Sequence, residues 1–340
     1  MWFLTATEKN AVIILDEPDV YMHADLQRKL IRLLFDQNYR QTVVATHSLE
    51  IISESEPQDI LVIDRKKPKS KFSNSIPGVQ EIIDRIGCVH NIQLTRLWAC
   101  KKCLLVEGDD PSILKHLYRK ISSDDEPFDR IPTMPINGWG GWNYAIGSSM
   151  ILKNASNEKI VTYCLLDRDY HTQEEIQSRL EDSKERKVEL HIWNKKELEN
   201  YLLIPTAISR IINSESKREK DIVTDSEISK QLEIIAEKLK DQTFDSLSNE
   251  LFLQDKGHGV QKANQKARNL VDSEWNSLEN KLSLVSGKDV ISKLSKWTQD
   301  NYKVSLSPER IAKELNVDEI SKEMVAVLKS IEQNKSFGLL

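Results

Sequence analysis

Two short apolar runs, each ending in acidic residues, place the strongest constraint on how this chain can fold. Residues 103–106 are apolar and precede Glu107, and residues 164–166 are apolar and precede Asp167 and Asp169. A continuous apolar run of this length, closed by Gly or Asp, is typical of a strand that is buried on both faces. The carboxyl ends of parallel strands share one edge of an open α/β sheet, so these runs predict that the three acids meet at that edge.

Acidic side chains gathered at one edge repel one another and raise one another's pKa values unless a cation neutralises them. Oxygen ligands favour Mg²⁺ or Mn²⁺, and Cys103 and Cys164 lie inside the apolar runs, where they are core residues rather than zinc ligands. Asp167 and Asp169 are two residues apart, so in an extended segment both face the same side. Each acid alone is explained as well by a helix cap or a turn. Two acid-tipped strands in one segment of alternating strands and helices favour a metal site.

The segment around these runs alternates expected strands with expected helices. The strands are expected at 102–106, 131–136, 160–166 and 188–193, and the helices at 112–121, 142–153 and 172–186. This alternation predicts a doubly wound parallel sheet with right-handed crossovers. After the last strand, Glu197 or Glu199 can return to the acidic edge. On a helix, the side chains of residues two apart point in different directions, so only one of these two can face the site, and we expect it to be Glu199. The alternative is that both are solvated acids at the start of a helix.

In this order and at these separations, residues 105–108, 166–169 and 197–201 resemble the Toprim domain of the OLD (overcoming lysogenization defect) family. That family joins an ABC-type ATPase to a metal-dependent nuclease. The resemblance covers residues 101–204. The resemblance implies that the acidic side chains of Glu107, Asp167, Asp169 and Glu199 bind metal and carry out the reaction. Glu197 occupies a position that is also acidic in the family's motif. The family usually has a further acid four residues after the first Glu; Pro111 stands there, which leaves Asp109 or Asp110 as candidate ligands.

Residues 1–64 are predicted to contain a strand, a helix and a second strand. An apolar run at 11–15 ends in Asp16 and Glu17, a helical period covers 25–38, and a run at 42–46 precedes His47. The first run resembles the Walker B strand of ABC-type ATPases, in which the Asp holds Mg²⁺ on the phosphates and the Glu orients or deprotonates water. His47 resembles the switch histidine of that family, which contacts the γ-phosphate. By itself it would be an ordinary histidine at a strand end.

The sequence contains no G-x-x-x-x-G-K-[ST] motif, the turn that would cradle nucleotide phosphates, and no ABC signature before the Walker B run. We therefore expect residues 1–64 to be the C-terminal half of an ABC-type ATPase head, left by a split or truncated gene or kept as a docking scaffold. ATP would bind only if a partner supplied the P-loop. We also expect this lobe to dock against an ATPase subunit or against a second copy of this chain. We do not expect this chain alone to hydrolyse ATP.

The predicted fold class is α/β, a Toprim domain preceded by a partial ATPase lobe and followed by a helical region. Residues 65–100 are expected to be a linker and helical connector, and residues 205–340 to be mostly helical. We prefer to interpret the helical region as a cap on the Toprim sheet. The alternative places Lys288 in the catalytic site, where its ammonium group would offset charge on the scissile phosphate.

Charge and hydropathy limit the possible functions. The net charge of −5 excludes a generally basic nucleic-acid coat, so nucleic acid must be held by local patches and metal. No apolar run is long enough to span a membrane and no signal peptide is recognisable, so we expect a cytoplasmic protein. The sequence and the resemblance predict an Mg²⁺-dependent endonuclease that cleaves DNA in defence against phage or foreign DNA, regulated by an ATPase head. The alternatives are an RNA-directed nuclease and a non-catalytic subunit that docks onto a complete ATPase.

Overall fold

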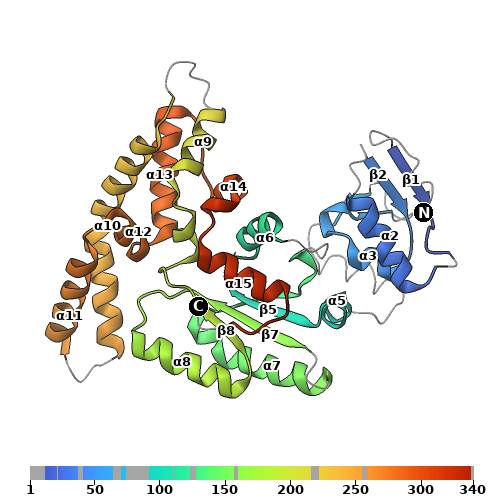
Figure 1. The fold of residues 1–340 in the computed structure, drawn as a ribbon, viewed down its shortest axis with the longest axis horizontal. Coiled ribbons are helices and arrows are strands. Elements are labelled where there is room, and N and C mark those ends of the chain that lie inside the picture. The colour runs from blue at the N-terminus through green and yellow to red at the C-terminus, as the bar shows by residue number, and fades with distance from the viewer. Residues whose placement is uncertain are drawn as a thin grey trace. The chain divides into compact units, whose positions relative to one another are not determined.

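The computed structural model describes residues 12–20, 22–36, 41–63, 70–73, 92–108, 110–122, 128–156, 160–215, 222–254 and 259–337. The chain divides into two compact units (Figure 1). The first comprises residues 1–101 together with 125–132, and the second comprises residues 102–124 together with 133–340. No helix in the described part of the chain is both long and apolar enough to cross a membrane.

The first unit begins with the expected order of strand, helix and strand. Strand β1 (Val12–Asp16) pairs in parallel with β2 (Gln41–Ala45), and α2 (Ala24–Asp36) connects them. The helix packs its apolar stripe on the strands, so that Leu30, Ile31 and Leu34 form a core with Ile13 and Ile51. The remaining elements are α3 (Leu49–Glu54), β3 (Leu61–Val62), β4 (Lys71–Phe72), α5 (Ile92–Cys100) and two short 3₁₀ turns, η1 (Pro57–Asp59) and η2 (Phe128–Arg130). Of the expected connector, residues 65–69 and 74–91 lie outside the described part.

The second unit is built on a four-stranded sheet in which every strand pair is parallel, as the alternation predicted. The strand order is β6-β5-β7-β8, with bounds β5 (Lys102–Glu107), β6 (Thr133–Ile136), β7 (Val161–Leu166) and β8 (Glu189–Ile192). Helices α6 (Asp110–Ile121), α7 (Trp142–Ser156) and α8 (Gln173–Arg186) connect them. The two acid-tipped runs occupy the central strands β5 and β7, and residues 103–106 and 163–166 are completely buried there. Burial on both faces is why these runs show no polar alternation.

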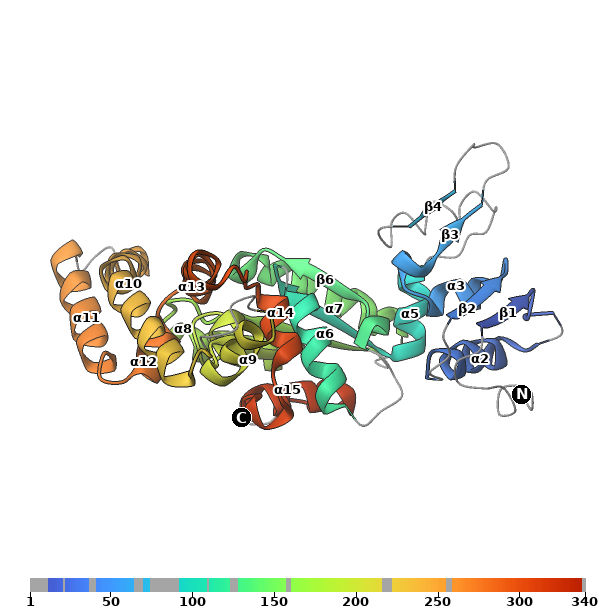
Figure 2. The ribbon, with the colours of Figure 1, turned by 90° about the horizontal axis from the view of Figure 1, so that it is seen from above.

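After β8 the chain is helical. The 3₁₀ segment η4 (Leu198–Leu202) is followed by α9 (Pro205–Glu215), α10 (Asp225–Gln254), α11 (Gly259–Glu274), α12 (Leu278–Leu284), α13 (Gly287–Tyr302), α14 (Pro308–Glu314), η6 (Val317–Glu319) and α15 (Lys322–Glu332). Helices α10 and α11 lie side by side in both views (Figure 1, Figure 2). Helix α15 returns to the sheet, where Lys102 Nζ donates to the carbonyl oxygens of Ile331 and Glu332 at 3.0 Å each.

Two stretches of this region with helical apolar spacing, residues 271–284 and 311–331, are each divided into shorter elements. The helical spacing over 271–284 is interrupted because the Ser277 hydroxyl accepts from Asn280 N and starts α12 as a new helix. The spacing over 311–331 is interrupted in the same way, since Ser321 caps α15 by accepting from Met324 N. Serine side chains compete with helical backbone bonds in this manner, and apolar periodicity alone does not detect it.

The ion pair between Arg210 and Glu319 fastens α9 to η6. The guanidinium donates to both carboxylate oxygens, at 2.9 and 2.6 Å, and these bonds, reinforced by Thr206, hold the pKa of Glu319 at about 2. A carboxyl group with a lowered folded-state pKa stabilises the fold above its ordinary pKa, here 4.5, and this stabilisation is lost as the pH falls toward 2.

Glu319→Gln should therefore lower the free energy of unfolding by about 1.5–3 kcal/mol at pH 7, the range for a hydrogen bond to a charged group. The difference in the free energy of unfolding between wild type and variant should become smaller as the pH falls below about 4. Urea unfolding across this pH range, with the exposed Glu185→Gln as the matched control, measures the gap. A gap that does not change with pH would show that the carboxylate charge is not what stabilises this contact.

Candidate active site

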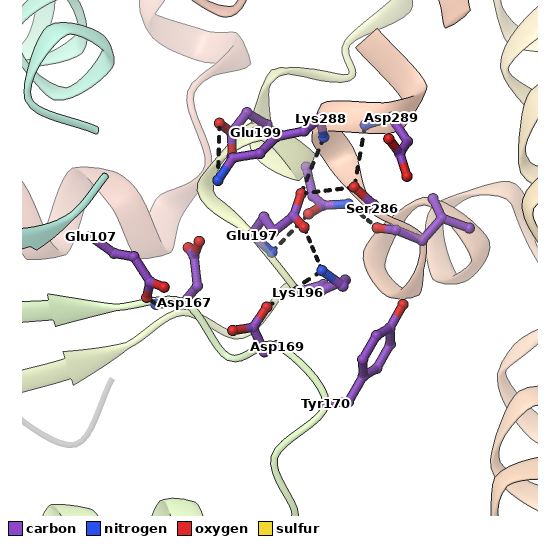
Figure 3. A network of polar contacts seen from close by, with 12 residues as sticks. Glu107, Asp167, Asp169, Tyr170, Lys196, Glu197, Glu199, Ser286, Lys288 and Asp289 are labelled. Carbon is purple, nitrogen blue, oxygen red and sulfur yellow. Dashed lines mark hydrogen bonds and ion pairs between the residues drawn. The ribbon is translucent and has the colours of Figure 1, made fainter. Parts of the chain in front are cut away.

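Two predicted acids meet where β5 and β7 end. Glu107 is the last residue of β5 and Asp167 follows β7 directly, and the Asp167 backbone N–H approaches Glu107 Oε2 at 3.4 Å (Figure 3). Asp167 is only 2% exposed, and its Oδ1 accepts from the backbone N–H of Leu198 at 3.0 Å. The parallel register of the sheet therefore brings together carboxylates that are 60 residues apart in the chain, as the strand ends indicated.

Asp169 reaches the same edge through a turn, which corrects the expectation of an extended segment. Its φ is +46°, in the left-handed region, and its backbone N–H donates to the carbonyl oxygen of Lys196 at 2.9 Å. The same-side argument from a spacing of two residues therefore does not apply here. The Asp169 charge nevertheless acts on Glu107, whose pKa is raised first by burial and next by this neighbouring carboxylate.

Glu197 and Glu199 stand on either side of the start of η4, and their surroundings differ. Glu197 accepts from Lys196 Nζ through Oε1, and from the Lys288 backbone N–H at 3.1 Å and the Ser286 hydroxyl at 3.4 Å through Oε2. Glu199 is 5% exposed, and its Oε2 is buried without a hydrogen-bond partner. Burial raises the pKa of Glu199. Glu199 is therefore a better candidate metal ligand than Glu197, because one of its carboxylate oxygens has no hydrogen-bond partner.

Lys288 lies next to Glu199 although 89 residues separate them. Its Nζ is 3.8 Å from Glu199 Oε1, and its side chain is 55% exposed. Lys288 is the second residue of α13, and this helix starts close against η4 because residue 287 is a glycine. A Cβ on Gly287 would meet the backbone nitrogen of Asn200 at 2.7 Å. The structure therefore brings Lys288 next to one of the predicted acids, Glu199.

A glycine-rich turn that sequence reasoning did not assign to the site completes this edge of the sheet. The turn is η3 (Gly138–Gly141), directly after β6, and the indole N–H of Trp139 donates to the Asp167 carbonyl oxygen at 2.9 Å. Gly138 has φ +50°, and a Cβ built on it would lie 2.5 Å from Glu107 Oε1. The sequence did contain an indication of this turn, because its most Gly-rich stretch follows an expected strand. Glycines in such a place often allow another group to approach the backbone closely.

The acids at this edge are spread more widely than the shell of one ion. Among the residues that the structure describes, the ligand atoms of three His, Cys, Asp or Glu side chains lie within 4.8 Å of one another only for His171, Glu175 and Glu250. Glu175 Oε2 in that trio is already used, since it accepts from the Thr172 backbone N–H at 3.0 Å and closes the capping box of α8. The position of Glu175 in this trio is therefore explained by the capping of α8, without a metal ion.

The donor atoms of the acidic edge are of the kind that a hard divalent cation binds. Its donors are carboxylate oxygens, the ligands that Mg²⁺ and Mn²⁺ prefer. Burial raises the pKa values of both Glu107 and Glu199, which means that their charged forms lack sufficient compensation from the protein. A cation would supply that compensation, and the unpartnered Glu199 Oε2 is an oxygen left for it. Of the other candidate ligands, Asp109 and the side chain of Asp110 lie outside the described residues.

The acidic and histidine positions of the first unit also come together. Asp16 ends β1, and Glu17 follows it with φ +41°. His47 follows β2, and its Nδ1 lies 3.3 Å from Glu17 Oε1, with both side chains more than half exposed. The parallel pairing of β1 and β2 thus places Glu17 and His47 at one edge of this sheet.

The chain is similar to a known domain family and to a known protein. Residues 1–53 match the family described as "AAA domain, putative AbiEii toxin, Type IV TA system". Over 121 residues, the chain is 25% identical to "Endonuclease GajA" of Bacillus cereus (strain VD045). This match covers 35% of the chain and 20% of that protein, so the chain spans about a fifth of the length of the relative it matches. Together the two matches support an AAA-like domain at the N-terminus and a resemblance to an OLD-like nuclease.

Proposed function

We propose that this chain is a metal-dependent nuclease of the Toprim type that cleaves phosphodiester bonds of DNA. The observation that supports this most directly is the buried, unpartnered Oε2 of Glu199, beside the ammonium group of Lys288 and on the same edge as Asp167. An unpaired buried carboxylate oxygen costs free energy, and a site that binds a cation offsets that cost. The similarity to an endonuclease supports the choice of reaction.

Glu107, Asp167, Asp169 and Glu199 would hold one or two Mg²⁺ or Mn²⁺ ions. When bound, such an ion polarises the phosphodiester and lowers the pKa of a coordinated water. The side chains and backbone of the protein would order the ligands and bind the substrate phosphate. Hydrogen bonds from Leu198 and Trp139 fix Asp167, so that its carboxylate does not need to be ordered when the substrate binds. The exposed ammonium group of Lys288 faces solvent beside the site, where it would bind a phosphate oxygen and offset the charge that develops on it.

The first unit would couple the nuclease to ATP. Its match to an AAA domain and the contact between Glu17 and His47 support a nucleotide-binding ancestry. The residues of this sequence include no P-loop motif, so ATP would be held only together with a P-loop from another source, such as an ATPase subunit. The proposed biological role is defence against phage or other foreign DNA, gated by that ATPase.

The test is cleavage of supercoiled plasmid, linear DNA and a structured RNA by the purified chain, with Mg²⁺ or Mn²⁺ present. We expect DNA cleavage that the double variant Asp167→Ala/Asp169→Ala lowers by about 10³-fold or more, since metal coordination contributes several kcal/mol to such reactions. Asp300→Asn, an exposed acid on α13, should retain activity.

Equal cleavage by the wild type and the double variant would exclude this edge as the active centre. Cleavage of RNA alone would reassign the substrate. Absence of cleavage with either metal, together with binding to a complete ATPase that survives the double variant, would favour the non-catalytic docking subunit.

A further inference from the structure

A cavity that the proposed reaction does not use lies beside the acidic edge. It has a volume of about 390 Å³, and it is lined by the loops after β7 and β8 and by helices α10, α11 and α12. Sites for small organic groups have volumes of about 300–1,000 Å³ and combine apolar walls with a few polar groups. The helical region thus forms one wall of a cavity that is large enough to hold such a group.

The helical wall of this cavity is apolar. It is lined by four leucine side chains, Leu247 and Leu251 on α10, Leu270 on α11 and Leu284 on α12. Leu247 and Leu251 belong to the core between these helices, whereas Leu270 is 44% exposed. Tyr170 lines the opposite side, and its hydroxyl donates to the Leu284 carbonyl oxygen at 3.2 Å. A ligand with apolar faces would cover these side chains and release water from them.

The other side of the cavity is shared with the acidic edge. Asp169 and Lys196 both line the cavity, and Lys196 Nζ lies 3.4 Å from Asp169 Oδ1 (Figure 3). Arg168 and Asn194 line it as well, and Arg168 Nη1 donates to the Asn194 carbonyl oxygen at 3.3 Å. The loop after β7 thus begins with the proposed metal ligand Asp167 and continues as a wall of the cavity. A polymer bound at the acidic edge can therefore place its next unit in the cavity.

The polar side chains of the cavity suit an uncharged group with hydrogen-bonding edges. Two carboxylates, Asp169 and Glu274, line it and would repel a phosphate placed inside. The side chains of Asn194 and Asn280 also line it, and an amide both donates and accepts hydrogen bonds. A nucleobase has this combination of an uncharged ring, apolar faces and an edge of donors and acceptors. Because a cavity of this size cannot admit a double helix, the base must leave its stack to enter.

We infer that this cavity binds one unstacked base of the substrate strand, from the nucleotide next to the phosphate at the acidic edge. The base would pack on the four leucine side chains, and its edge would form hydrogen bonds with Asn194 and Asn280. Its own phosphate would stay outside, beside Arg168. This role rests on the proposed function for the nature of the substrate, but it concerns how a strand is held rather than how it is cleaved.

The test compares oligonucleotides that share one backbone and differ in one base. Each is a dodecamer of abasic tetrahydrofuran nucleotides. Four carry a single central adenine, guanine, cytosine or thymine, and the fifth carries no base. Binding to the full chain is followed by fluorescence anisotropy, with Ca²⁺ in place of Mg²⁺ to separate binding from cleavage. We expect at least one base to raise the affinity about tenfold, as stacking of a single base does elsewhere. Leu251→Trp, which fills the cavity with an indole ring, should remove this advantage.

Leu253→Trp is the matched control, because it adds the same ring to α10 at a residue that is 51% exposed and does not line the cavity. It should keep the tenfold advantage. If Leu251→Trp does not fold, as judged by circular dichroism, Asn194→Ala replaces it, since this exposed side chain can be removed without loss of packing. Asn194→Ala should lower the advantage about threefold through one lost hydrogen bond, and Asn249→Ala, exposed on α10, should not.

Equal affinity of the wild type for all five oligonucleotides would overturn the inference, and so would an absence of binding or an advantage that persists in Leu251→Trp. The four deoxynucleoside monophosphates form a second set of probes. If they bind and Leu251→Trp abolishes this while the oligonucleotides bind equally, the cavity takes a free nucleotide, and its role in holding a strand is wrong. A base advantage in a chain that cleaves no nucleic acid would refute the proposed function alone. Cleavage of DNA without a base advantage would refute only the role of the cavity.

Discussion

Glu199→Gln should lower metal-dependent cleavage by about 10³-fold, equivalent to about 4 kcal/mol, while leaving the metal-free fold at least as stable as the wild type. The buried carboxylate has an oxygen without a partner and a pKa raised by burial, so replacing it with a neutral amide removes an unfavourable charge. The same change removes a ligand from the proposed metal site. Initial rates of plasmid cleavage and urea unfolding without metal measure the two effects.

Glu197→Gln provides the comparison, because it makes the same chemical change two residues away. This carboxylate is satisfied by Lys196 and by the start of α13, so its neutralisation should lower the free energy of unfolding by about 1.5–3 kcal/mol. The two variants should therefore separate, one losing activity with stability retained and the other losing stability. Loss of activity without loss of stability in Glu197→Gln would reverse the assignment of the two acids.

Gly138→Ala should lower cleavage by about 10²-fold, with substrate binding less affected than the rate. A methyl group at this position would lie 2.5 Å from Glu107 Oε1, so the carboxylate or the turn must move. Displacement of a reacting group by about 1 Å is enough for an effect of this size. The residue also has φ +50°, so we expect an additional stability cost of about 1 kcal/mol.

Gly140→Ala in the same turn is the matched control, because a Cβ there would meet nothing within 4 Å. It should leave both cleavage and unfolding close to those of the wild type. Steady-state rates against DNA concentration for the two variants make the comparison. Equal losses in both would show that the whole turn, rather than the contact with Glu107, sets the activity.

The sequence by itself determined the parallel sheet and the edge at which the acids gather. Both rest on local information, since a strand buried on both faces must be continuously apolar and parallel strands must end at a common edge. Residues 103–106 and 164–166 satisfy this requirement in the central strands. The strand, helix and strand of the first unit follow from apolar periodicity in the same way.

Only the tertiary structure decided which groups complete the site. Glu197 and Glu199 look alike in the sequence, but α13 supplies hydrogen bonds to the first and leaves an oxygen of the second unpartnered. Lys288 reaches the site because Gly287 lets α13 approach η4 closely, and Gly138 matters because Glu107 packs against it. These relations depend on contacts between residues distant in the chain. Periodicity and motif spacing describe neighbours along the chain, and they hold no information about which distant backbone will lie against a given side chain.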